Sequence, residues 1–93
     1  MKTALTIAGS DSSGGAGIQA DIKTMSALGV YAESVVTALT AQNTMGVQGV
    51  VATDPDFVLL QIESVFSDIC PNAVKIGMLP TAEVVRAVGQ GLQ

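Results

Sequence analysis

The residues with the clearest potential for chemistry lie in a glycine-rich stretch from Gly9 to Asp21. Four glycines fall within nine residues of this stretch, at positions 9, 14, 15 and 17. Glycine lets the backbone adopt a positive φ and approach a ligand closely. A helical pattern of apolar residues follows, with Ile18, Ile22, Met25 and Leu28 near one another on one face. Because the N–H groups at a helix start attract anions, the pattern predicts a site for a polar or anionic small molecule.

The spacing of Gly9 and Gly14 is that of the first two glycines of a P-loop. A P-loop then needs a lysine to reach the terminal phosphates and a hydroxyl residue for magnesium, but Gly15 and Ala16 occupy those positions. The sequence therefore argues against a P-loop nucleoside triphosphatase.

Residues 15–20 match the G-x-G-x-x-A pattern of dinucleotide-binding folds, and Glu33 lies roughly where a ribose-binding acid is expected. Two features speak against this interpretation. Residues 10–14 separate Gly9 from the motif, whereas the glycines of a dinucleotide fold follow the first strand almost directly. Glu33 also stands at the beginning of the second strand instead of its far end. A dinucleotide-binding module remains an alternative from a different functional class.

Composition limits the classes of fold and function. The 93 residues allow one domain at most, and 48% are hydrophobic while 13% are charged, against about 25% charged in an average chain. This balance suits a parallel sheet with both faces buried, and it indicates that some of the surface is covered by something outside this chain. With one cysteine and no histidine, the chain has no intrachain disulfide, zinc-histidine site or Ser-His couple.

The charge pattern bears on partners and location. The net charge is −4, only four residues are basic and 3% are aromatic, which is not the composition of a nucleic-acid-binding surface. No apolar run approaches the ~18 residues of a membrane span, and the N-terminus lacks a cleavage-type sequence. We expect a cytoplasmic protein with no membrane partner.

The elements that must position the glycine-rich stretch alternate along the chain. We expect strands at residues 3–8, 30–41 and 73–77, with a short extended segment at 47–52 and a polar break at 42–46. We expect three helices. The first covers residues 15–28 and is ended by Gly29, the second runs from a cap at 53–54 to just before Pro71, and the third runs from a cap at Thr81 to the end of the sequence. This order predicts an unfinished doubly wound α/β unit, in which ligands bind beyond the carboxyl ends of the strands.

Four blocks, residues 4–23, 37–48, 61–68 and 74–79, closely resemble the hydroxymethylpyrimidine/phosphomethylpyrimidine kinase family in its own order and spacing. This family is the thiamine-pathway member of the ribokinase-like superfamily. The resemblance implies an α/β, ribokinase-like, three-layer αβα fold with a mostly parallel sheet. It also implies that residues 1–93 are the N-terminal part of a single, incomplete kinase domain.

The same resemblance implies ATP- and Mg²⁺-dependent phosphorylation of 4-amino-5-hydroxymethyl-2-methylpyrimidine and then of its monophosphate. The residues that bind ATP and Mg²⁺ would lie beyond this chain, so we assign it no catalytic residue and no metal ligand and expect it to be inactive alone. The resemblance implies substrate-binding roles for six residues. Gln42 would hold the pyrimidine through its side-chain amide, and Gly9 and Ala16 would line the site with backbone. Asp21 would make a polar contact, and Thr40 and Met78 would form walls beside the ring.

The chemistry of Gln42 supports its implied role, because a carboxamide offers both a donor and an acceptor to an aminopyrimidine edge. Purely structural roles are the alternatives: Gln42 as a turn residue, Asp21 as an acid near a helix N-terminus, and Met78 as a core residue. Lys23 and Lys75 are assigned no chemistry.

At the level of the whole protein, a pyridoxal kinase of the same superfamily and a non-catalytic binding or assembly fragment remain alternatives. The excess of apolar residues also leads us to expect a homo-oligomer.

Overall fold

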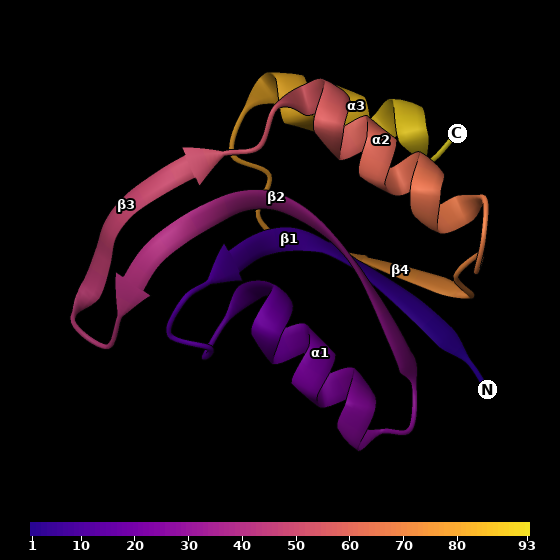
Figure 1. Ribbon diagram of the computed structural model, residues 1–93, viewed down its shortest axis with the longest axis horizontal. Coiled ribbons are helices and arrows are strands. Elements are labelled where there is room, and N and C mark those ends of the chain that lie inside the picture. Colours follow the sequence, from indigo (N-terminus) through magenta and orange to yellow (C-terminus); the bar gives the residue numbers. More distant parts are fainter.

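A computed structural model describes all of residues 1–93 and shows strands and helices in alternation (Figure 1). The elements in chain order are β1 (Thr3–Asp11), α1 (Gly17–Ala27), β2 (Tyr31–Asn43), β3 (Gly46–Ala52), α2 (Pro55–Phe66), β4 (Ala73–Ile76) and α3 (Ala82–Gly91). Every element predicted from the sequence is present. None of the three helices is long and apolar enough to cross a membrane.

The four strands form one sheet in the order β3-β2-β1-β4. β1 pairs in parallel with both β2 and β4, while β2 and β3 form an antiparallel hairpin. The predicted α/β architecture with a mostly parallel sheet is therefore confirmed. The carboxyl ends of β1, β2 and β4 lie at the same edge of the sheet, which is where ligands bind in open α/β folds.

Helices cover both faces of the sheet, as the three-layer prediction requires. α1 lies on one face, and α2 and α3 pack together on the other (Figure 1). Side chains alternate along β1: Leu5 and Ile7 join the apolar cluster with α2 and α3, whereas the Thr6 hydroxyl contacts α1. Strand periodicity of two residues explains this division.

The main core lies between the sheet and the α2–α3 layer. Its seven buried residues come from β1, β2, α2 and α3: Leu5, Ile7, Val35, Val58, Ile62, Val84 and Val88. The α1 layer is thinner, since Ile18 is the only buried residue of that helix. The face that carries α1 is consequently held more by polar contacts, which are described below.

Local signals in the sequence set several helix ends. The Asp54 side chain accepts a hydrogen bond from the Asp56 N–H at 2.8 Å, and Pro55 is the first helical residue of α2. Thr81 caps α3 by accepting from the Val84 N–H at 3.1 Å. Gly29 follows α1 with a φ of +74°. These caps and this C-terminal glycine agree with the sequence prediction.

Several boundaries differ from those predicted, among them the ends of β1, β2 and α2. β1 continues past residue 8 to Asp11 because, after a register shift at Gly9, its backbone still pairs with β2. β2 continues through Gln42, which was predicted in a polar break, because pairing with β3 keeps it extended. α2 ends at Phe66, before the predicted position near Pro71, and Ser67 caps it.

Candidate functional site

A cavity of about 300 Å³ opens at the carboxyl edge of the sheet. Its volume lies at the lower end of the range for small-molecule sites. The lining comes from the end of β1, the start of α1, the β2–β3 hairpin and the segment after β4: Gly9, Ser10, Asp11, Ala16, Gly17, Thr40, Gln42, Val47, Val50 and Met78. Segments far apart in the sequence thus meet where an open α/β fold places its ligand.

Five of the six residues predicted to bind substrate line this one cavity. They are Gly9, Ala16, Thr40, Gln42 and Met78. Asp21 is the exception, because it lies one turn into α1 and is not part of the lining.

The carboxylate of Asp11 organises the loop between β1 and α1. Its Oδ1 accepts from the N–H and the hydroxyl of Ser13 at 2.8 and 2.7 Å. Its Oδ2 accepts from the N–H groups of Gly15 and Ala16 at 3.0 and 2.8 Å. The hydroxyl of Ser13 and the backbone N–H groups of Ser13, Ala16 and Gly15 hold the pKa of Asp11 below its usual value, although burial opposes them.

This arrangement bears on the expectation that N–H groups near the start of α1 would receive an anion. The N–H groups of Gly15 and Ala16 already donate to an internal carboxylate. They are also the groups that a dinucleotide pyrophosphate would need. The glycine-rich stretch therefore forms a wall of the cavity instead of a phosphate cradle.

Close approach of two backbone segments explains the glycine at the start of α1. Gly17 has a φ of +58°, and a Cβ atom there would overlap the carbonyl oxygen of Gly9. At Gly9, a Cβ atom would lie 2.6 Å from Cε of Met78. These two glycines bring the loop against β1 and leave room for the Met78 side chain.

The loop is also tied to the end of β2. The Ser12 hydroxyl donates to the carbonyl oxygen of Gln42 and accepts from its N–H, both at 2.7 Å. Beside it, the Thr40 hydroxyl lies 2.8 Å from the carbonyl oxygen of Ser10. It also lies 3.0 Å from the side-chain amide of Gln42. The backbone and the side chain of Gln42 are both positioned by contacts with neighbouring residues.

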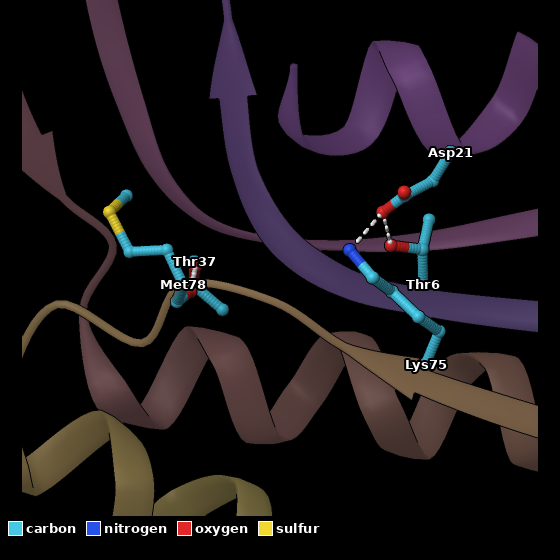
Figure 2. Close-up of polar contacts among 5 residues, drawn as sticks. All are labelled: Thr6, Asp21, Thr37, Lys75 and Met78. Carbon is cyan, nitrogen blue, oxygen red and sulfur yellow. Dashed lines mark hydrogen bonds and ion pairs between the residues drawn. The ribbon is translucent and has the colours of Figure 1, made fainter.

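Met78 lines the cavity from the segment after β4. Figure 2 shows it beside Thr37. Its carbonyl oxygen accepts a hydrogen bond from the Thr37 hydroxyl at 2.8 Å. Thr37 is fully buried on β2, and this bond joins β2 to the segment after β4, a strand that does not pair with β2. Thr37 thereby fixes the backbone from which the Met78 wall projects.

Asp21 belongs to a separate polar cluster between α1 and the sheet (Figure 2). Its Oδ2 accepts from the Thr6 hydroxyl at 2.6 Å and from the Lys75 ammonium at 2.8 Å. Burial by itself would raise the pKa of Asp21, but the hydrogen bonds from Lys75 and Thr6 outweigh it, so the pKa lies below its usual value. The cluster holds α1 to β1 and β4, and half of the Lys75 side chain remains exposed.

The residues present do not form a site for nucleotide phosphates or for a metal ion. No lysine or arginine lines the cavity, and the chain has no group of three acidic, cysteine or histidine side chains close enough to hold a metal. No reaction step through ATP or Mg²⁺ is assigned to these residues.

Sequence reasoning missed several residues of the site. Asp11, Ser12 and Thr37 act through hydrogen bonds to other parts of the chain, and Val47 and Val50 supply apolar walls. A local signal existed for Asp11 alone, because an aspartate followed by serine and glycine is typical of side-chain-to-backbone turns.

Comparisons with known proteins identify the family of the chain. The family model for phosphomethylpyrimidine kinase matches residues 11–93. A hydroxymethylpyrimidine/phosphomethylpyrimidine kinase from Escherichia coli K12 is 62% identical over 90 residues, which are 97% of this chain and 34% of the relative. The crystal structure of a phosphomethylpyrimidine kinase from Clostridium difficile 630 has a TM-score of 0.96 at 55% identity, covering 99% of this chain and 40% of that one.

An ADP complex of a pyridoxal kinase from Bacillus subtilis is also similar, with a TM-score of 0.90 at 40% identity over 99% of this chain and 36% of that one. The fold is thus that of the ribokinase-like small-molecule kinases. Within that class, the chain belongs to the phosphomethylpyrimidine kinase family. It spans 34% of the length of the Salmonella typhimurium and Escherichia coli relatives.

Proposed function

We propose that this chain supplies the substrate-binding side of a kinase domain that phosphorylates 4-amino-5-hydroxymethyl-2-methylpyrimidine and its monophosphate in thiamine biosynthesis. The observation that carries the proposal is the cavity in which the Gln42 amide stands among backbone and apolar walls. Membership of the phosphomethylpyrimidine kinase family supports the same substrate class.

In this proposal the Gln42 carboxamide pairs with the aminopyrimidine edge, donating to a ring nitrogen and accepting from the amino group. The side chains of Val47, Val50 and Met78 provide apolar contact for the ring. Gly9 and Ala16 let the backbone of the glycine-rich stretch come close to it.

ATP is the proposed phosphoryl donor, with Mg²⁺ as its counterion. The ADP complex of the similar Bacillus subtilis kinase supports the use of an adenine nucleotide. When bound, the nucleotide and metal would supply the phosphoryl group and neutralise its charge. The residues of this chain contribute binding and orientation of the acceptor.

Pyridoxal is the second candidate substrate, because a pyridoxal kinase shares 40% identity and the fold with this chain. A dinucleotide-binding module has less support, since the Asp11 carboxylate takes the N–H groups that its pyrophosphate would need. Titration with NADH is expected to leave the nucleotide fluorescence unchanged.

The decisive experiment joins residues 1–93 to the remaining two thirds of the Escherichia coli relative and measures ATP-dependent phosphorylation. We expect turnover of the pyrimidine and little turnover of pyridoxal. A preference for pyridoxal, or no turnover of either by a folded chimera, would contradict the proposal.

Replacement of Gln42 by alanine in the same chimera tests the binding role. Loss of two neutral hydrogen bonds should weaken pyrimidine binding about tenfold to a hundredfold. Gln48→Ala is the matched control, because the Gln48 side chain is exposed on β3 and bonds only the nearby Gly46 carbonyl. Equal affinities of the two variants would remove Gln42 from the site.

We also propose that the protein is cytoplasmic and that it associates with copies of itself. Large apolar side chains are exposed on β2, β3 and α2, among them Leu39, Val51, Phe57 and Leu60. Exposed apolar surface of this kind marks contact regions. Light scattering on the full chain is expected to give a mass above that of a monomer, and a monomer at micromolar concentration would contradict this part.

A further inference from the structure

The Thr40 hydroxyl stands at a junction that decides how Gln42 faces the cavity. Its Oγ1 lies 2.8 Å from the carbonyl oxygen of Ser10. It lies 3.0 Å from the end of the Gln42 carboxamide that occupies the Oε1 position. Both Thr40 and Gln42 line the cavity, so the junction lies in the wall of the candidate site.

A hydroxyl group has a single proton to donate, and both neighbours of Thr40 Oγ1 would be acceptors if Oε1 faced it. The Ser10 carbonyl can only accept a hydrogen bond. Its distance of 2.8 Å from Oγ1 is typical of an O–H···O bond, and it takes the proton. The 3.0 Å contact with Gln42 is typical of an N–H···O bond.

The lone pairs of Oγ1 are therefore free to accept a hydrogen bond from Gln42. A half-turn of the terminal amide exchanges its nitrogen and oxygen without changing its shape, so the hydrogen-bond network decides which atom faces Thr40. A continuous chain of donors results, from Gln42 Nε2–H to Thr40 Oγ1–H to the carbonyl oxygen of Ser10.

We propose that Thr40 is a specificity-determining residue that holds Gln42 with Nε2 toward the strand and Oε1 toward the cavity. This inference rests on the proposed function, since the ligand that it selects is the aminopyrimidine. Oε1 then accepts from the 4-amino group, and the second Nε2 proton remains free for the neighbouring ring nitrogen.

The fixed amide also fixes the direction of the ring. In the proposed substrate the hydroxymethyl arm is attached next to the carbon that carries the amino group. Placing the amino group at Oε1 therefore determines on which side of Gln42 the arm lies. A 4-oxo analogue presents an acceptor and a ring N–H donor in the reverse order, so two like groups would face each other at each position.

The test measures binding of the 4-amino compound and its 4-oxo analogue to the full natural chain by calorimetry. We expect the ratio of the two affinities to fall about tenfold in Thr40→Val, because the amide can then turn to suit either ligand. Thr40→Ser keeps the hydroxyl and should keep the ratio. Thr53→Val is the matched control, because Thr53 lies outside the cavity lining.

A second measurement needs no ligand. In the NMR spectrum of the wild-type chain, one Nε2 proton of Gln42 should exchange slowly with solvent, and this protection should disappear in Thr40→Val. Rapid exchange of both protons in the wild type, or an unchanged affinity ratio in Thr40→Val, would overturn the inference. Slow exchange together with failure to bind either pyrimidine would support the amide orientation and refute the proposed function.

Discussion

Replacing Gly17 by alanine tests how the glycine-rich stretch is held against β1. Gly17 has a φ of +58°, and a Cβ atom there would overlap the carbonyl oxygen of Gly9. A left-handed backbone costs a residue with a Cβ about 1–2 kcal/mol. Forcing an extra carbon into a packed region adds about 1–3 kcal/mol.

Gly29 provides the matched control, because it separates the two costs. Its φ is +74°, but no atom lies within 4 Å of a Cβ built there. Gly29→Ala has the same conformational cost as Gly17→Ala and restricts the unfolded chain equally, but its Cβ atom overlaps no other atom. The difference between the two variants in free energy of unfolding should therefore equal the overlap alone, about 1–3 kcal/mol.

The assay is urea unfolding of the full chain, followed by pyrimidine binding to each variant under folding conditions. Gly17→Ala should unfold more easily than Gly29→Ala and should bind more weakly, because the displaced carbonyl belongs to the cavity wall. Equal unfolding free energies would refute the close approach. Normal binding by a destabilised Gly17→Ala would refute its connection to the site.

Three further predictions concern buried and charged groups. Thr37→Val removes the hydrogen bond to the Met78 carbonyl, and should lower the free energy of unfolding by about 1–3 kcal/mol and weaken pyrimidine binding. Full pyrimidine affinity measured by calorimetry would show that Met78 does not need this bond. Folding lowers the pKa of Asp11, so the ionised carboxylate stabilises the folded chain above about pH 4, and this stabilisation is lost on acidification. Between pH 5 and pH 3, the free energy of unfolding should therefore fall more for wild type than for Asp11→Asn. Burial, and to a smaller extent repulsion from Asp68, raise the pKa of Glu33, so Glu33→Gln should raise the free energy of unfolding at pH 7. A lower free energy in urea unfolding would contradict the raised pKa.

The sequence was sufficient to predict the order of the elements, because apolar periodicity, Pro55, the Thr81 cap and Gly29 are local signals. It did not predict how far β1 and β2 extend. Their last residues are polar or small, and they are extended only because neighbouring strands pair with them. Local preference was overridden there by tertiary hydrogen bonds.

The candidate site was predictable to the extent that it followed the family resemblance. The structure brings Gln42 and Met78 together with Gly9, Ala16 and Thr40 at one cavity, and their roles in substrate binding stay a prediction. Several contacts that orient these residues were not predictable, because they link positions that are distant in the sequence. Thr37, for example, reads as an ordinary strand residue until its hydroxyl is seen to bond a carbonyl 41 positions away.

The internal carboxylate also changes what the glycine-rich stretch can bind. An empty loop with several N–H groups at a helix start would attract an anion. Here Asp11 brings a negative charge into that loop and uses the N–H groups of Ser13, Gly15 and Ala16. A second anion beside Asp11 would meet repulsion from its carboxylate. Gly17, for its part, allows close packing of backbone against Gly9.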